Sequence, residues 1–268
     1  MTPFEVKYGT GIVRFVHFFS YPEGVTVEDG EQWYFGEHIP QVKKLSGVTR
    51  YRTWRGLPPI SVPSPYPYDR FVRMSELVFE NMAIAQQATL GNTSLWTAAS
   101  AEEPGFGEFE CVFLDEQPQF DLIKDTPVQQ YKYAALPLKF SGGEHQYDDE
   151  EDAIILVYMF NYCVPAADGE DWYLGHHARE GKLAKQVGLR HYQTWRTLPA
   201  PEKPGNPLNP NRYYRLTEEG LPAWTRAGPK EASPPRPRLL ITMPQFGEVF
   251  TDLINIAIDP KQVQNVLA

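Results

Sequence analysis

The sequence predicts an α+β protein built from two tandem copies of one unit, and three observations support this prediction. The chain has 268 residues, enough for two domains of about 130 residues each. Short sequence blocks recur once at a nearly constant offset, and each copy mixes strand-like runs with helical patterns. With 42% hydrophobic and 22% charged residues, the composition is that of a folded globular protein.

The duplication is clearest in one block of ten residues. Asp29-Gly-Glu-Gln-Trp-Tyr-Phe-Gly-Glu-His38 recurs as Asp168-Gly-Glu-Asp-Trp-Tyr-Leu-Gly-His-His177, with seven of ten positions identical. Four further blocks recur in the same order, at an offset of 139 to 142 residues for the whole set: 19–21 and 160–162, 48–58 and 189–199, 69–76 and 211–218, 106–108 and 246–248. Five blocks in one order indicate a tandem duplication.

Each copy is predicted to fold in the order β-α-β-β-α-β, which is the ferredoxin-like order. The expected strands of the first copy lie near 12–19, 48–55, 70–74 and 108–114, and those of the second near 154–160, 189–196, 212–216 and 248–256. Asp29 and Asp168 are expected to cap the first helices, which end at Gly47 and Gly188. Second helices are expected at 80–90 and 218–226, and proline-rich loops at 57–67 and 198–210.

These patterns also predict the domain organisation. We expect residues 1–117 to form the first repeat, residues 118–152 to connect the copies, and residues 153–268 to form the second repeat.

Composition excludes several classes of protein. No run of 18 apolar residues predicts a membrane-spanning helix, and the N-terminus lacks a signal-peptide pattern. Two cysteines, Cys111 and Cys163, cannot form a disulfide framework, so we expect a cytoplasmic protein. A net charge of −9 argues against nucleic acids and anionic membranes as partners.

One stretch carries a family resemblance. His38-Ile-Pro40 through Gly47-Val-Thr-Arg-Tyr51 resembles the EthD-like branch of the dimeric α+β barrel superfamily. The second copy keeps His177, Gly188 and Tyr192 but has Arg179 in place of the proline. The resemblance implies that two ferredoxin-like units pair their sheets into a barrel, here within one chain, and that small ligands bind between sheet and helices.

The superfamily hosts several chemistries, so the resemblance does not choose a reaction. It includes cofactor-free monooxygenases, muconolactone isomerases, polyketide cyclases and dehydratases, and haem enzymes such as chlorite dismutase.

Tyr34 and His38 are the candidate catalytic pair, repeated as Tyr173 and His177. Residues four apart project from one face of a helix. A neutral imidazole can accept or donate a proton at cellular pH, and a nearby phenol can orient it. The alternative is that both histidines are structural and bond to backbone carbonyls.

Further side chains are candidate substrate contacts. Four tryptophans could stack a planar substrate, although such regular positions also suit a core: Trp33, Trp172, Trp54 and Trp195. Arg55 and Arg196 could hold a carboxylate or enolate, or pair with nearby glutamates. His17 aligns with Tyr158, and Arg50 aligns with His191, which suggests two unequal pockets. Gly36 and Gly175 suggest close packing of these helices against a strand or a ligand.

The sequence holds no clustered metal-binding motif, nucleotide-binding loop or serine-hydrolase elbow, and a single axial histidine for haem remains open. We therefore expect a cofactor-independent enzyme that performs acid–base chemistry (elimination, isomerisation or cyclisation) on a small hydrophobic, aromatic or polyketide-like molecule. The alternatives are a cofactor-free monooxygenase of an aromatic substrate and a non-catalytic ligand-binding protein. The fused repeats could also pair as a homodimer.

Overall fold

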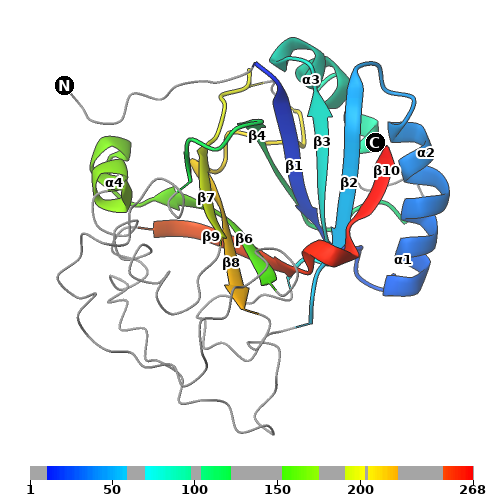
Figure 1. Cartoon of the computed structure of the whole chain (residues 1–268). Coiled ribbons are helices and arrows are strands. Elements are labelled where there is room, and N and C mark those ends of the chain that lie inside the picture. Colours follow the sequence, from blue (N-terminus) through cyan, green and yellow to red (C-terminus); the bar gives the residue numbers. More distant parts are fainter. Residues whose placement is uncertain are drawn as a thin grey trace, which may run out of the picture.

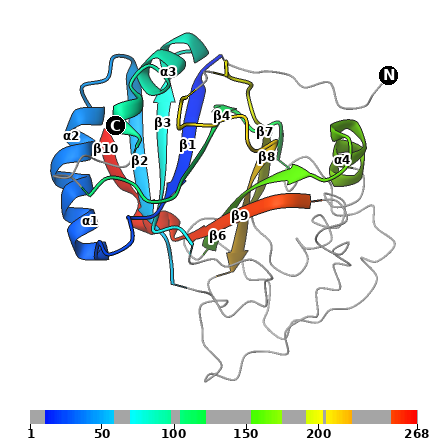
Figure 2. The ribbon, with the colours of Figure 1, turned by 180° about the vertical axis from the view of Figure 1, so that it is seen from behind.

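The computed structural model describes residues 11–58, 70–97, 104–121, 153–174, 191–202, 205–222 and 250–267. These residues form two five-stranded antiparallel sheets that face each other (Figures 1 and 2).

The first sheet has the strand order β10-β2-β3-β1-β4. Its strands are β1 (Val13–Phe19), β2 (Val48–Arg55), β3 (Arg73–Phe79), β4 (Phe109–Asp115) and β10 (Gln264–Leu267). The associated helices are α1 (Val27–Trp33), the π-helical segment η1 (Tyr34–His38), α2 (Ile39–Val42), α3 (Met82–Thr89) and the short 3₁₀ helix η2 (Thr93–Leu95). In Figures 1 and 2, α1, α2 and α3 lie on the side of this sheet that faces away from the second sheet.

The second sheet has the order β5-β7-β8-β6-β9. Its elements are β5 (Phe120–Asp121), β6 (Ala153–Tyr162), α4 (Ala166–Trp172), β7 (His191–Arg196), β8 (Arg215–Pro222) and β9 (Phe250–Ile258), followed by η8 (Pro260–Gln262). Without the edge strands β10 and β5, both sheets follow the ferredoxin-like order, fourth strand, first, third, second. The predicted ferredoxin-like repeats are therefore confirmed.

Strand alternation divides the core into an outer and an inner layer. On β1, Phe15, His17 and Phe19 point toward the helices, whereas Val16 and Phe18 point toward the second sheet. The inner layer combines apolar side chains of both sheets, such as Met74 with Leu216. The two sheets therefore enclose one common core, while α1, α2 and α3 lie on the outer side of the first sheet and Trp172 of α4 packs against Phe250 of the second.

Contacts between the sheets close this arrangement. Beyond the end of β2, Gly56 forms a bridge with Ile258 of β9, and the Leu57 N–H donates to the Ala257 carbonyl at 2.7 Å. The equivalent contact beyond β7 is the Leu198 N–H donating to the Phe113 carbonyl of β4 at 2.8 Å. The edge strands are also exchanged, because β10 near the end of the chain completes the first sheet and β5 completes the second.

Several predicted boundaries are wrong. Thr26, not Asp29, caps α1, because its hydroxyl accepts from the Asp29 N–H at 3.1 Å, and Pro165 precedes α4 where Asp168 was expected to cap it. The predicted helix at 218–226 is wrong at its start, since β8 continues to Pro222. Residues 223–226 and the expected cap at Gly188 lie outside the described residues, whereas Gly47 has the expected left-handed φ of 82°.

The glutamate of the repeated Asp-Gly-Glu sequence belongs to a buried polar network in each repeat. Glu31 of α1 accepts from the Tyr21 hydroxyl at 2.7 Å and from Arg73 Nε at 2.6 Å. Arg73 also donates to the Thr53 hydroxyl at 3.0 Å. The second repeat contains the same arrangement, formed by Tyr162, Glu170, Arg215 and Thr194. Each network ties the first helix of a repeat to its sheet.

Position 30 requires glycine because a tyrosine ring lies where a Cβ atom would be. A Cβ atom at Gly30 would lie 2.4 Å from the Tyr21 ring, and one at Gly169 would lie 2.3 Å from the Tyr162 ring. Gly36, by contrast, is exposed and a Cβ there would meet nothing within 4 Å. The expected close packing of Gly36 against a strand is therefore wrong, while Gly175 lies outside the described residues.

These two glycines make a matched pair for a stability test. Gly30→Ala is expected to lower the free energy of unfolding by about 1 to 3 kcal/mol, because the methyl group displaces the Tyr21 ring. Gly36→Ala is expected to be neutral or to stabilise by up to about 1 kcal/mol, because alanine favours a helix and meets no neighbour. Urea unfolding of both variants measures the difference. Equal midpoints for the two would show that the Tyr21 contact carries no stability.

Candidate functional site

His38 lies at the end of the π-helical segment, on the outer side of the first sheet. The Ile39 N–H donates to the Tyr34 carbonyl five residues back, which defines this widened turn. Such turns are frequent at functional sites. The His38 ring is 2% exposed, and the aromatic rings of Trp33, Tyr34, Trp96 and Phe106 have centroids 4.8 to 5.5 Å from it.

His17 reaches the same place from β1. Its side chain is fully buried, with the ring centroid 4.9 Å from that of Phe109 and 5.3 Å from that of Phe15. The Trp96 ring, which follows η2, joins the two histidines because its centroid lies 5.5 Å from each imidazole centroid. Sheet, first helix and the segment after α3 thus bring His17, His38, Trp33 and Trp96 together, and we call these four residues the histidine–tryptophan cluster.

Among the described residues, five ring nitrogens of this cluster have no hydrogen-bond partner. They are His17 Nδ1 and Nε2, His38 Nε2, Trp33 Nε1 and Trp96 Nε1, all buried. Buried polar atoms in folded proteins are nearly always paired, so a group of five in one place calls for a functional explanation. A neutral imidazole has one donor and one acceptor nitrogen, and each indole has a donor. The cluster therefore offers both a proton acceptor and several hydrogen-bond donors.

Burial keeps both histidines neutral. Desolvation lowers the pKa of His38 to about 3. The pKa of His17 is also lowered well below its ordinary value, first by burial and then by the proximity of His38. At neutral pH both imidazoles are uncharged and each keeps an acceptor nitrogen.

These shifts predict how stability depends on pH. Below pH 6.5 the unfolded chain protonates His17 and His38 while the folded protein does not, so stability falls as the pH falls from 6.5 toward 3. Each buried neutral imidazole contributes up to about 1.4 kcal/mol per pH unit in this range. Urea unfolding between pH 7.5 and 5 is expected to show this slope, and His17→Phe is expected to reduce it. An unchanged slope in His17→Phe would contradict a neutral, buried His17.

Tyr34 and Tyr173 are held by hydrogen bonds to their own sheets. The Tyr34 hydroxyl hydrogen-bonds with Tyr51 and with Ser75, both at 2.7 Å, and its ring stacks on that of His38 at 5.3 Å. The expectation that the pair shares one side of the helix is confirmed, and the contact between them is between rings. In the second repeat, Tyr173 hydrogen-bonds with Thr217 at 2.8 Å and with Tyr192 at 3.1 Å. His177 lies outside the described residues.

The predicted tryptophan contacts do not form one site. Trp33 belongs to the outer layer beside His38, whereas Trp54 and Trp195 belong to the inner core between the sheets. Trp172 packs against Phe250, with ring centroids 5.2 Å apart. Trp33 and Trp172 lie on helices and Trp54 and Trp195 on strands, and periodicity alone does not show which of these elements meet at one site.

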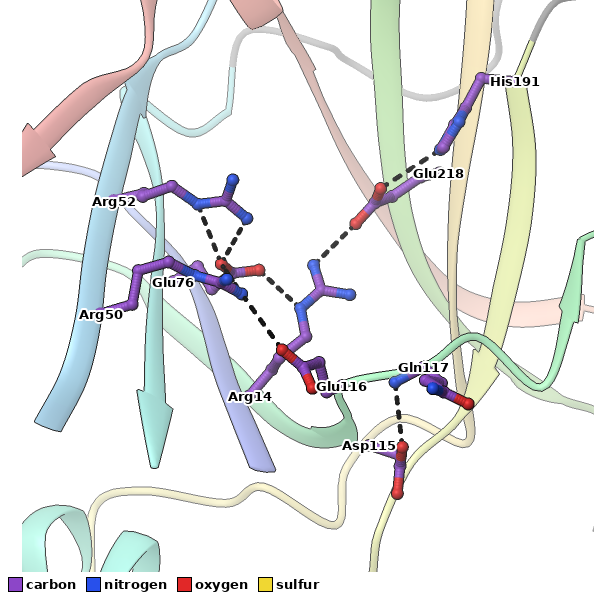
Figure 3. Close-up of polar contacts among 9 residues, drawn as sticks. All are labelled: Arg14, Arg50, Arg52, Glu76, Asp115, Glu116, Gln117, His191 and Glu218. Atoms are coloured by element: carbon purple, nitrogen blue, oxygen red, sulfur yellow. Dashed lines mark hydrogen bonds and ion pairs between the residues drawn. The ribbon is translucent and has the colours of Figure 1, made fainter. Parts of the chain in front are cut away.

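The predicted arginines also lie apart from the histidine–tryptophan cluster. Arg55 is exposed, and Arg196 lies over the Tyr214 ring at 4.9 Å. The inner face instead contains an ion network centred on Arg14, shown in Figure 3. Arg14 binds Glu76 of its own sheet at 2.5 Å and Glu218 of the second sheet at 2.9 Å.

Two of the predicted residues belong to this inner network. His191 lies 3.3 Å from Glu218, and Arg50 lies 3.5 Å from Glu76, which also accepts from Arg52 at 2.7 Å. Burial would raise the pKa of Glu218, but Arg14 and His191 lower it to about 2. The network is therefore charged at neutral pH and links the two repeats.

Sequence reasoning missed Trp96, Phe106 and Phe109, which enclose the histidines. Phe106 did carry a signal, since Phe106-Gly-Glu108 is one of the repeated blocks. Trp96 had none, because it follows a short 3₁₀ turn and belongs to no repeated block. Within the described residues, no group of three or more His, Cys, Asp or Glu side chains could hold a metal ion. No helix in the described ranges is long and apolar enough to cross a membrane.

Comparison with solved structures fits this architecture. An anthrone oxidase-like protein superposes on the chain with a TM-score of 0.53 at 11% identity, covering 97% of this chain and 95% of that one. The chain has the fold of a dimeric α+β barrel. Here the barrel closes within a single polypeptide, as the resemblance of the His38–Tyr51 stretch implied.

Two other similar structures have lower TM-scores. A protein described as a candidate monooxygenase from Fusobacterium nucleatum subsp. nucleatum has a TM-score of 0.44 at 9% identity, covering 96% of this chain and 95% of that one. Chlorite dismutase from Candidatus Nitrospira defluvii has a TM-score of 0.42 at 10% identity, covering 94% and 92%. No protein-family model matches the sequence of this barrel, and no curated protein sequence matches it.

Proposed function

We propose that this barrel is a cofactor-independent enzyme that removes a proton from a small, planar, enolisable aromatic or polyketide-like molecule at the histidine–tryptophan cluster. The supporting observation is a group of five buried ring nitrogens, enclosed by aromatic side chains, for which the described part of the chain offers no hydrogen-bond partner. The EthD-like resemblance at His38-Ile-Pro40 is consistent with chemistry on the helix side of the first sheet.

The chemistry follows from the protonation states. An uncharged His38 or His17 accepts the proton, since each imidazole is neutral at cellular pH. The negative charge then develops on the substrate oxygen, and the Trp33 and Trp96 N–H groups can donate to it. A low imidazole pKa opposes proton transfer in the free enzyme. The adjacent substrate anion compensates, because it stabilises the imidazolium in a site shielded from water.

The fate of the anion decides the overall reaction. Elimination, isomerisation and cyclisation all rearrange electrons within the substrate and return the proton from the imidazolium. The second candidate is oxygenation, in which the carbanion reacts with dissolved oxygen, and the likeness in fold to the anthrone oxidase-like protein favours testing it.

Anthrone is a suitable probe because its acidic methylene group lies beside a carbonyl-conjugated ring system. Under nitrogen in deuterium oxide, we expect the protein to accelerate exchange of the methylene hydrogens, measured by mass spectrometry against a protein-free control. In air, oxygen uptake matched to loss of anthrone would identify the oxygenase. No acceleration in either experiment would contradict enzymatic action on this substrate class.

Binding of anthrone with its unchanged recovery would instead support a carrier. A Soret band in the purified protein would identify a haem protein and replace the cofactor-independent proposal.

A further inference from the structure

The outer face of the second sheet differs from that of the first at two neighbouring positions. Strand register places Tyr158 of β6 where β1 has His17, and Glu219 of β8 where β3 has Leu77. Tyr158 and Glu219 contact each other, because the Tyr158 hydroxyl donates to Glu219 Oε2 at 3.1 Å. The second repeat therefore has a carboxyl group and a phenol where the first has an imidazole and an apolar side chain.

Glu219 is unusual in its lack of a basic partner. Within the described residues, it hydrogen-bonds to Tyr158 and to no arginine, lysine or histidine. Five other glutamates on the two sheets and their first helices have arginine partners: Glu31, Glu76, Glu110, Glu170 and Glu218. The phenols of Tyr173 and Tyr192 lie near enough to Tyr158 to affect its pKa.

This environment favours a protonated carboxyl group. Burial raises the pKa of Glu219, and the hydrogen bond from Tyr158 lowers it only in part. Since Tyr158 donates to Oε2, a carboxylic proton on Oε1 would be available to a ligand. Glu219 is partly exposed. A neutral carboxylic acid beside a tyrosine is an effective donor to a carbonyl or phenolic oxygen.

We propose that Glu219 and Tyr158 form a second ligand site, on the outer face of the second sheet, for a small molecule that presents a carbonyl or phenolic oxygen. The site is separate from the histidine–tryptophan cluster, because it lies on the other sheet. No basic side chain of the described residues bonds to Glu219, so the site discriminates against carboxylates, which arginine would otherwise pair with.

The test uses the full-length protein and 4-nitrophenol as the probe, with 4-nitrobenzoate as the charged comparison. Calorimetric titration at a pH below the pKa of 4-nitrophenol is expected to show saturable binding of 4-nitrophenol and weaker binding of 4-nitrobenzoate. Glu219→Leu introduces the residue that the first repeat has at the equivalent position. It is expected to weaken 4-nitrophenol binding about three- to tenfold. Glu219→Gln keeps a neutral donor and is expected to retain binding within about threefold.

Two controls separate this site from the proposed catalytic one. His38→Gln is expected to leave 4-nitrophenol binding at Glu219 unchanged while it strongly slows anthrone exchange. Infrared spectra at pH 7 are expected to show a carboxylic acid band that disappears in Glu219→Gln. The proposal is overturned if 4-nitrophenol does not bind or if Glu219→Leu binds it as well as the unsubstituted protein. It also fails if 4-nitrobenzoate binds more tightly or Glu219 is ionised at pH 7.

Discussion

His38→Gln is expected to slow proton abstraction from anthrone by about 10² to 10⁴-fold, because glutamine fills similar space but cannot accept the proton. The rate of hydrogen–deuterium exchange under nitrogen measures the loss directly. With the pKa of His38 near 3, the unsubstituted protein is expected to keep its exchange rate between pH 8 and pH 5. A rate that falls around pH 6.5 would contradict a buried neutral base.

Tyr34→Phe is the matched control for His38→Gln. The phenylalanine ring keeps the stacking on His38 but loses the hydrogen bonds to Tyr51 and Ser75. We expect exchange within about threefold of the unsubstituted rate and a loss of stability of about 1 to 3 kcal/mol. If His38→Gln and His17→Gln both kept full exchange activity, the proposed catalytic role of the cluster would be wrong.

Arg14→Met is expected to destabilise the protein by about 3 to 5 kcal/mol, because it leaves two buried carboxylates without their shared partner. Arg52 still neutralises part of the charge on Glu76, whereas Glu218 keeps only the weaker contact with His191. Urea unfolding at pH 7 measures the loss. Adding Glu76→Gln and Glu218→Gln to Arg14→Met is expected to recover part of it, since no buried charge then remains uncompensated.

Arg70→Met is the control for Arg14→Met. Arg70 forms an ion pair with Glu108, but both side chains are substantially exposed, so a loss below about 1 kcal/mol is expected. A similar loss for both variants would show that burial between the sheets adds nothing to the contribution of the Arg14 network to the free energy of unfolding.

Sequence reasoning found the duplication and most strands because strand alternation and repeated blocks are local signals. It also placed Tyr34 and His38 on one side of the first helix, where their rings do stack. It misassigned 218–222 because the polar run Thr-Glu-Glu resembles a helix start, whereas strand pairing with β6 decides the outcome. Tertiary pairing overrides such local preferences.

The composition of the site could not be read from the sequence. His17 and His38 are 21 positions apart, and nothing in their spacing shows that Trp96 lies between their rings. Which side of a strand faces the helices also depends on how the two sheets pack. The sequence therefore did not show that Trp54 belongs to the inner core, whereas Trp33 lies on the helix side. That no basic side chain of the described residues bonds to Glu219 is likewise a three-dimensional property. The roles assigned to these side chains stay predictions until the experiments above are done.

The exchange of edge strands has a consequence for biosynthesis. One edge of β2 pairs with β10, whose residues 264–267 leave the ribosome long after the rest of the first sheet. Until then the free edge of β2 presents unpaired backbone groups, and such an edge is a template for intermolecular pairing. A chain truncated before β10 is thus at risk of aggregation even though its first repeat is whole, and production of the native barrel depends on translation reaching β10.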